Sequence, residues 1–231
     1  MAEIDNKWKG RRLKREVFVL LREENFERAV ETMRSLPGRR VINPLFSFLC
    51  SMEPQIRWRA IKAIGEVVTS IAREDMESAR VIMRRMIWNL NDESGGIGWG
   101  MPEAMGEVMA RHEGLAREYV NILLSYIRKN GNFLEHEPLQ RGVLWGLARL
   151  AQTRPELVNQ AVPDLQAFLT SEDATLRGLA AWAIGLLGAG QDIPDLEILK
   201  SDDTEVTLCL NGTERAYRIS ELARKALDAD G

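Results

Sequence analysis

The sequence predicts an all-α fold in which helix pairs stack into a right-handed superhelix that ends in a small β-hairpin and a last helix. A ten-residue pattern recurs with its last residue at positions 65, 106, 148 and 185. The resulting spacings of about 40 residues are typical of solenoids built from helix pairs. Apolar residues in the copies follow helical spacing, and an alternating segment near the C-terminus predicts the hairpin.

Two helices are predicted near the N-terminus, at about 11–22 and 25–35, where they would cover the open end of the stack. We therefore assign residues 1–38 to an N-terminal helical cap, residues 39–190 to four repeats and residues 191–231 to a C-terminal cap. A chain of 231 residues, of which 45% are hydrophobic, can bury a continuous core.

Each repeat is predicted to consist of an outer helix, a turn and an inner helix. The inner helices carry the recurring pattern at 56–65, 97–106, 139–148 and 176–185. One place in each copy holds a small residue that lets neighbouring helices approach closely: Ala63, Ala104, Gly146 and Ala183. The outer helices are expected over 44–49, 81–90, 120–127 and 163–169.

The C-terminal segment changes from helical to alternating spacing. Residues 204–210 alternate between apolar and polar side chains, and Asn-Gly at 211–212 separates them from a second extended run that reaches Ile219. Asn-Gly between alternating runs is a strong signal of a two-residue hairpin turn. Ser220 is expected to cap a last helix over 221–227. The turn fixes the register of the strands, which pairs Val206 with Tyr217 and Glu205 with Arg218.

The last of the four repeats has a proline and leucines on its outer helix, an acidic turn, and an arginine followed by small residues and a glycine on its inner helix. This order resembles a HEAT repeat of the phycobilisome-lyase type. Arg57 and Arg177 occupy the family's arginine position, whereas the middle repeats have Gly98 and Gln140 there. The resemblance extends over about residues 40–190 and implies a helical-repeat fold. It leaves the function open, because such repeats serve scaffolds, lyases and glycosylases.

The charges are unevenly distributed along the chain. Residues 1–90 carry 18 Lys+Arg and 12 Asp+Glu, while residues 91–231 carry 13 and 22. The net charge of −3 opposes a role in nucleic-acid binding like that of HEAT-like DNA glycosylases, which use a basic groove. The longest apolar stretch, 179–187, is too short to cross a membrane, and the first residues lack the pattern of a secretion signal. We expect a cytoplasmic protein with neither a membrane nor a nucleic acid as its partner.

The leading functional hypothesis is a non-enzymatic scaffold that binds a protein or peptide on its concave face. Inner helices line this face in helix-pair solenoids, and spacing of four residues puts tryptophans and charged residues on the side opposite the buried stripe. Trp and Arg are frequent among binding hot spots. The alternative is that the rings fill gaps between repeats. The candidate binding residues are Trp58, Arg59, Lys62, Trp99, Glu103, Arg141, Trp145 and Trp182.

A second candidate is an acidic edge formed by the turns before two neighbouring inner helices. Stacking would place Glu93 beside Glu135 and Ser94 beside His136, on ridges about 10 Å apart. A divalent cation or a basic segment could bind there, so a lyase-like or metal-dependent activity is the alternative function. Ordinary polar turns with helix-capping acids explain the same residues. The acidic edge comprises Asp92, Glu93, Glu135, His136 and Glu137.

Two His-Glu pairs, at 112–113 and 136–137, can be compared with those that bind iron in the deoxyhypusine hydroxylases, which are helical-repeat enzymes. One pair follows an inner helix and the other precedes the next, so about 20 Å would separate them. No Ser-His-Asp or Cys-His arrangement supports nucleophilic catalysis. We therefore assign no catalytic residue, metal or cofactor.

Four glycines within 95–100 disfavour a helix and indicate either a partner close to Trp99 or tight packing.

Overall fold

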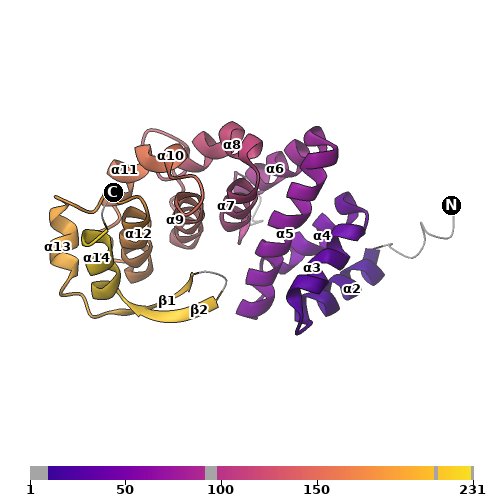
Figure 1. Cartoon of the computed structure of the whole chain (residues 1–231), viewed down its shortest axis with the longest axis horizontal. Coiled ribbons are helices and arrows are strands. Elements are labelled where there is room, and N and C mark those ends of the chain that lie inside the picture. Colours follow the sequence, from indigo (N-terminus) through magenta and orange to yellow (C-terminus); the bar gives the residue numbers. More distant parts are fainter. Residues whose placement is uncertain (1–9, 92–97, 211–212, 230–231) are drawn as a thin grey trace. The chain divides into compact units, whose positions relative to one another are not determined.

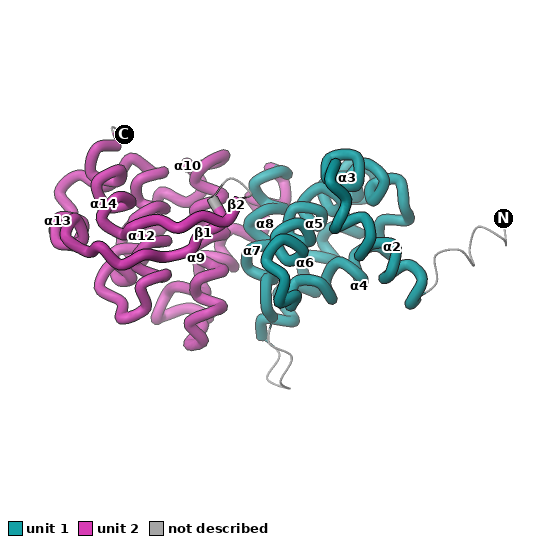
Figure 2. The backbone as a smooth tube through the Cα atoms, turned by 90° about the horizontal axis from the view of Figure 1, so that it is seen from below, with its two compact units in different colours: residues 1–112 teal, residues 113–231 magenta. Residues whose placement is uncertain are grey.

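The computed structural model describes residues 10–91, 98–210 and 213–229. The chain forms two compact units, residues 1–112 and 113–231 (Figure 2). Both units are built mainly from helices (Figure 1). In the described part of the chain, helix pairs are followed by one two-stranded sheet near the C-terminus, which confirms the predicted fold class.

The helices of unit 1 begin where the sequence carries local start signals. The side chain of Asn25 accepts a hydrogen bond from the N–H of Arg28 and thereby caps a helix. Asp75 caps another helix in the same way, and Pro54 opens a third in the first turn, where proline is tolerated. The described helices are α2 (Gly10–Arg22), α3 (Phe26–Ser35), α4 (Gly38–Phe48), α5 (Pro54–Glu74), α6 (Met76–Leu90) and α7 (Met101–Arg111).

Helix α5 is the centre of unit 1, because it packs against α2, α3, α4, α6 and α7. It approaches α7 closely at Gly65, where a Cβ atom would lie 2.7 Å from Cγ of Glu107. Arg111 donates a hydrogen bond of 2.6 Å to the Glu107 carboxylate on its own helix and forms an ion pair of 2.7 Å with Glu66 on α5. One guanidinium therefore joins carboxylates from both inner helices at a place where Glu107 is buried.

Unit 2 continues the helix pairs and adds the hairpin. The outer helix of the last repeat is divided into short segments, and Pro163 lies in the first turn of the last of them. The elements are α8 (Glu113–Ser125), α9 (Glu137–Ala151), α10 (Pro155–Val158), η1 (Asn159–Ala161), α11 (Val162–Gln166), α12 (Ala174–Leu186), α13 (Pro194–Leu199), β1 (Glu205–Leu210), β2 (Thr213–Arg218) and α14 (Ile219–Leu227).

The hairpin has the predicted register. The carbonyl oxygen of Thr204 also accepts a hydrogen bond of 3.1 Å from the N–H of Ile219, so pairing begins just before β1. The predicted turn at 211–212 lies outside the described residues. The predicted cap is wrong, because α14 begins at Ile219 and the Ser220 hydroxyl donates its hydrogen bond to Asp203. The confirmed pairs are Val206 with Tyr217 and Glu205 with Arg218.

Arg177, at the arginine position of the HEAT resemblance, connects three segments of unit 2. Its guanidinium donates hydrogen bonds to the carboxylate of Asp202 at 2.9 Å and to the carbonyl oxygens of Ser171 and Glu172. Burial alone would raise the pKa of Asp202, but hydrogen bonds from Thr204 and Arg177 keep this pKa below its ordinary value. The arginine therefore joins the acidic turn before α12 to the segment that leads into the hairpin.

Two features differ from the predicted boundaries. Helix α7 begins at Met101 and not at 97, because Gly100 has a φ of 72° immediately before it. The boundary between the compact units lies after residue 112, whereas the division into an N-terminal cap, four repeats and a C-terminal cap follows the sequence repeats and stays a prediction.

Among the described residues, no helix has the length and apolar character needed to cross a membrane.

We predict that Gly65→Ala lowers the free energy of unfolding by about 1–3 kcal/mol, because the new methyl group overlaps the Glu107 side chain. In a Glu107→Ala background the same change should cost less, because only the flexible Arg111 side chain, 3.0 Å from the new methyl group, then has to move, and alanine favours a helix over glycine by about 1 kcal/mol. Urea denaturation of the four proteins in this double-mutant cycle measures the coupling. An equal effect of Gly65→Ala in both backgrounds would contradict the assigned contact.

Candidate functional site

The candidate binding residues lie on the inner helices of both units. Trp58, Arg59 and Lys62 belong to α5, Trp99 precedes α7 and Glu103 lies in its first turn. In unit 2, Arg141 and Trp145 belong to α9 and Trp182 to α12. Each unit thus contributes its own part of the predicted surface, and the two parts have different surroundings.

In unit 1, two tryptophans are accessible, one on an inner helix and one immediately before the next inner helix. Trp58, near the start of α5, is half-buried, and the Arg57 guanidinium lies 5.7 Å from the centre of its ring. Trp99, immediately before α7, is 37% exposed. Lys62 is exposed one turn after Trp58. Because α5 packs against α7, this part of unit 1 combines aromatic rings with cations, the types of side chain that often anchor binding partners.

Arg59 has a structural role that sequence reasoning missed. Its Nη1 donates hydrogen bonds of 2.9 and 2.8 Å to the carbonyl oxygens of Leu21 and Glu23, at the end of α2. Its guanidinium also lies 4.9 Å from the centre of the Phe26 ring. The last carbonyl groups of a helix have no partner within the helix. Arg59 therefore satisfies the end of α2, and we remove it from the candidate binding residues.

Glu103 is the buried acid of this region. The residue as a whole is half-buried, while its Oε2 atom is shielded from solvent and has no hydrogen-bond partner among the described residues. Burial raises the pKa of Glu103 to about 7, and this effect exceeds the opposing effects of a hydrogen bond from its own backbone and of the Arg57 charge. The folded protein therefore holds a proton on this carboxyl at slightly acidic pH.

In unit 2, the hairpin covers the inner face of α9 and α12. The indole Nε1 of Trp145 donates a hydrogen bond of 2.7 Å to the carbonyl oxygen of Cys209 in β1. At Gly178 of α12, a Cβ atom would lie 3.1 Å from Cγ2 of Val206 in the same strand. Figure 1 shows the hairpin beside the lower ends of these two helices, and Figure 2, seen from below, shows it passing over them. Strand β1 thus takes the place that an external ligand would need.

The expected accessibility of Trp145 is therefore not found. Its side chain is 7% exposed, because the hairpin lies over it. Arg141 donates a hydrogen bond of 2.8 Å to Asp173, whose other oxygen caps the start of α12. Trp182 is half-buried on α12. The sequence could not separate these roles, because a tryptophan on an inner helix fits a binding groove and a hairpin contact equally well.

The acidic edge is only partly described. Asp92 and Glu93 lie outside the described residues. Glu135, His136 and Glu137 are exposed in unit 2, where His136 stands at the N-cap position of α9. No group of three or more His, Cys, Asp or Glu side chains in the described ranges is arranged to hold a metal ion. The edge therefore stays a prediction.

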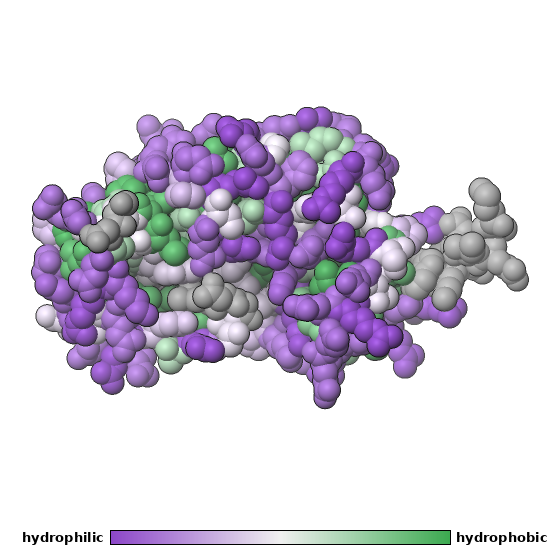
Figure 3. Space-filling view, in the orientation of Figure 1, coloured by the Kyte–Doolittle hydropathy of each residue, from purple (hydrophilic) through white to green (hydrophobic). Residues whose placement is uncertain are grey.

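Trp88 on α6 is an exposed residue that sequence reasoning did not single out. Its 73% exposure is higher than that of Trp99. The sequence contains a signal for this exposure. The helical spacing of Ile82, Met83 and Met86 predicts the buried face of α6, and Trp88 lies outside that face. On the face that Figure 3 shows, most of the surface is hydrophilic and hydrophobic residues lie in small groups.

Comparisons with known proteins agree with this architecture. Residues 137–187 match the family model of the HEAT-like repeat. An uncharacterized protein of Archaeoglobus fulgidus is 26% identical over 179 residues, which cover 74% of this chain and 86% of that protein. A designed armadillo repeat protein in complex with the peptide (KR)4 has a TM-score of 0.54 at 15% identity and covers 95% of this chain and 99% of its own. Another designed armadillo repeat protein has a TM-score of 0.50 at 16% identity, with coverages of 94% and 99%.

We predict that Trp145→Phe loosens the hairpin by about 1–3 kcal/mol, because it removes the donor to a buried carbonyl and reduces the ring. Amide hydrogen exchange should become faster in β1 and remain unchanged in α8. Trp182→Phe, which changes the half-buried tryptophan of α12, is the matched control and should have the smaller effect. Unchanged exchange in β1 would disprove that Trp145 holds the strand.

We predict that Glu103→Gln stabilises the protein by about 1–3 kcal/mol at pH 8. The pKa of Glu103 is raised from 4.5 to about 7 on folding, so its contribution to stability is complete below pH 4.5 and is lost as the pH rises through 7. The advantage of the glutamine variant should therefore shrink from pH 8 to pH 5. Urea denaturation at several pH values measures it, and a difference that does not vary with pH would contradict the assigned burial.

Proposed function

We propose that this chain, which carries a HEAT-like repeat over residues 137–187 within an armadillo-like fold, is a scaffold that binds a protein or peptide partner through unit 1. The observation that carries the proposal is the accessibility of two tryptophans, Trp58 on α5 and Trp99 immediately before α7, the helix that packs against α5. A designed protein of similar fold is in complex with a peptide, which supports a peptide or protein segment as the partner class.

The proposal places the surface in unit 1, because the corresponding face of unit 2 is already covered. Trp145 and Gly178 lie under β1, so a partner would have to displace the hairpin to reach them. Lys62 needs no such displacement, because it is exposed. The revised binding residues are Trp58, Lys62, Trp99 and the nearby Arg57.

The surface suits a partner segment with an apolar or aromatic side chain. A tryptophan buried on binding removes a large apolar area from water, at roughly 25 cal/mol per Å2. Arg57 holds its guanidinium over the Trp58 ring, so the ring's orientation is set before a partner arrives. Pre-ordering of this kind reduces the entropy lost on binding.

No contact among the described residues supports the alternative function, a lyase-like or metal-dependent activity at the acidic edge. Asp92 and Glu93, two of its five residues, fall outside the described residues, and Glu135 and His136 are exposed. We therefore propose binding without catalysis as the function.

A random peptide library selected against the immobilised full-length chain tests the proposal. We expect Trp58→Ala or Trp99→Ala to weaken the selected peptides about 10- to 100-fold by titration calorimetry. Trp88→Ala removes an exposed tryptophan from α6 and should change the affinity less than about threefold. Thermal melting checks that each variant is folded. Equal losses for all three variants, or no loss for Trp58→Ala and Trp99→Ala, would reject the surface.

A further inference from the structure

The hairpin of unit 2 has an open edge along β2. Strand β2 pairs with β1 in a two-stranded sheet, so its second edge has no neighbouring strand in the described part of the chain. The elements that pack most on β2 are β1 and α14, whereas α12 packs on β1. Arg215 and Ala216 in the middle of β2 are exposed. An edge of this kind offers backbone groups for pairing with a further strand.

The register shows which backbone groups of β2 point outward. The N–H of Ile219 donates to the carbonyl oxygen of Thr204, so these two residues form a hydrogen-bonded pair. In an antiparallel ladder, hydrogen-bonded and non-hydrogen-bonded pairs alternate. Counting along the register makes Ala216 and Thr207 a non-hydrogen-bonded pair. The N–H and C=O groups of Ala216 therefore point away from β1, and no backbone hydrogen bond joins them to another described segment.

The opposite edge of the hairpin is covered by α9. The carbonyl oxygen of Cys209 in β1 accepts the hydrogen bond of Trp145, which is buried there. A further strand therefore has room beside β2 and not beside Cys209. A sheet formed by joining two hairpins through β2 would end on α9 at both sides, so assembly would stop at two copies.

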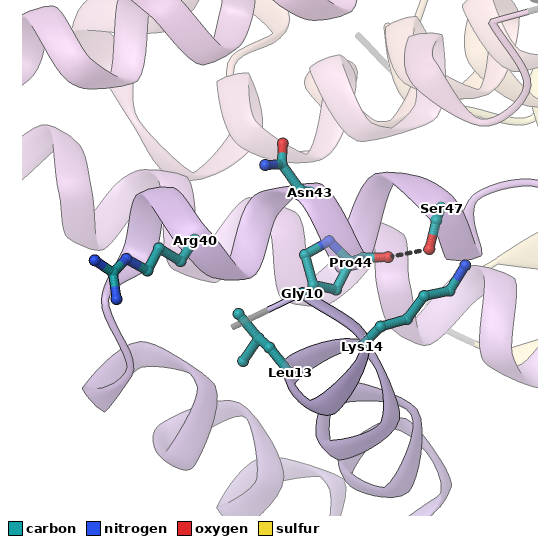
Figure 4. Close-up of a pocket in the computed structure, with 7 residues that line it drawn as sticks. All are labelled: Gly10, Leu13, Lys14, Arg40, Asn43, Pro44 and Ser47. Carbon is teal, nitrogen blue, oxygen red and sulfur yellow. Dashed lines mark hydrogen bonds between the residues drawn. The ribbon is translucent and has the colours of Figure 1, made fainter. Parts of the chain in front are cut away.

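The hollow between α2 and α4 in unit 1 is less open to a partner than this edge (Figure 4). Its apolar residues Leu13 and Pro44 are buried. The hydroxyl of Ser47 donates a hydrogen bond of 2.7 Å to the carbonyl oxygen of Pro44. Groups in the lining of the hollow are thus engaged by the protein itself, whereas the outward backbone groups of Ala216 are not.

We propose that β2 pairs antiparallel with β2 of a second copy of this chain, about a twofold axis at Ala216. Each Ala216 then donates its N–H to Ala216 of the second copy and accepts a hydrogen bond in return. The two hairpins, each of two strands, form one continuous sheet. Pairing of one surface with itself about a twofold axis is the commonest symmetry of homodimers.

The side chains of β2 select this register. In twofold pairing, residues whose backbone groups point outward must lie opposite each other, which leaves three places for the axis. An axis at Arg215 would set two guanidinium groups directly opposite each other, where like charges are destabilising. An axis at Tyr217 would leave most of β2 unpaired, because the strand ends at Arg218. The axis at Ala216 avoids both penalties.

At this register, side chains of complementary character face each other. Arg215 lies opposite Tyr217 of the second copy, where its guanidinium can pack on the ring. Arg215 is exposed, and its side chain makes no hydrogen bond or ion pair with the described residues. Glu214 lies opposite Arg218 of the second copy. Arg218 is 3.8 Å from Glu205 of its own chain, and both side chains are exposed, so a second carboxylate can approach it.

Charged residues on an edge strand usually keep other strands away. The order of charges on β2 differs from such a barrier, because an acid and a base lie at equal distances on either side of Ala216. Reversal of the strand therefore brings unlike charges together. This self-complementarity favours a second copy over an unrelated strand as the occupant of the edge.

Sedimentation equilibrium of the full-length chain tests the proposal. We expect the apparent mass to rise from that of one chain, 26.2 kDa, toward twice that value between about 1 and 200 µM. Ala216→Pro should raise the dissociation constant at least tenfold, because it removes the outward N–H, and proline is tolerated where an edge N–H faces solvent. Ala216→Ser keeps this N–H and is the matched control, which should change the constant less than about threefold.

Charge reversal tests the register. Glu214→Arg should weaken the dimer at least tenfold, because it sets arginines opposite each other at both ends of the paired segment. Adding Arg218→Glu to the same chain exchanges the two charges and should restore the dissociation constant to within about threefold. Thermal melting checks that each variant is folded. If Ala216→Pro lowers the melting temperature, the charge exchange decides.

The proposal is overturned if the chain stays monomeric up to about 200 µM, or if its mass grows beyond two copies. It is also overturned if folded Ala216→Pro dimerises as the unchanged chain does, or if the charge exchange fails to restore the dimer. Pairing through β2 goes beyond the proposed function and needs neither Trp58 nor Trp99. Trp58→Ala should therefore leave the mass unchanged, so each proposal can fail without the other.

Discussion

Each helix pair of this chain has an apolar face that only a neighbouring element can cover, and the rest of the structure follows from this constraint. In unit 1 the long helix α5 supplies the cover, because it packs against all five other described helices of the unit. The contact with α7 is so close that Gly65 leaves room for Glu107. The ion pairs around Arg111 then hold the two inner helices in register. In unit 2, α14 and the hairpin cover the face of α12 in the place of a further helix pair.

The sequence was sufficient to predict the helices and the hairpin, because both have local signals. Helical spacing of apolar residues marks each inner helix, and alternation around Asn-Gly gave the register of Val206 with Tyr217. The docking of the hairpin could not be predicted. It depends on a contact between Trp145 and Cys209, which are 64 residues apart. Nothing in the local pattern of either residue specifies that partner.

In the candidate site, too, the local sequence pattern does not specify which distant residue a side chain contacts. Arg59 and Trp145 have the residue types and positions expected of a binding surface, yet their donors are used by carbonyl groups of the protein itself. Trp99 keeps its exposure because it precedes a helix and does not lie within one. Sequence spacing identifies the face of a helix on which a side chain lies. It does not identify what covers that face.

The long separation of Trp145 from its strand also has a consequence during protein synthesis. The helix pairs consist of segments close in sequence, and such contacts form early and quickly. The inner face of α9, in contrast, waits until the strand containing Cys209 has been translated. At about 5–20 residues per second, that interval is several seconds. During it, the inner face of α9 around Trp145 is uncovered in the nascent chain, and β1 shields that face only after the strand has been made.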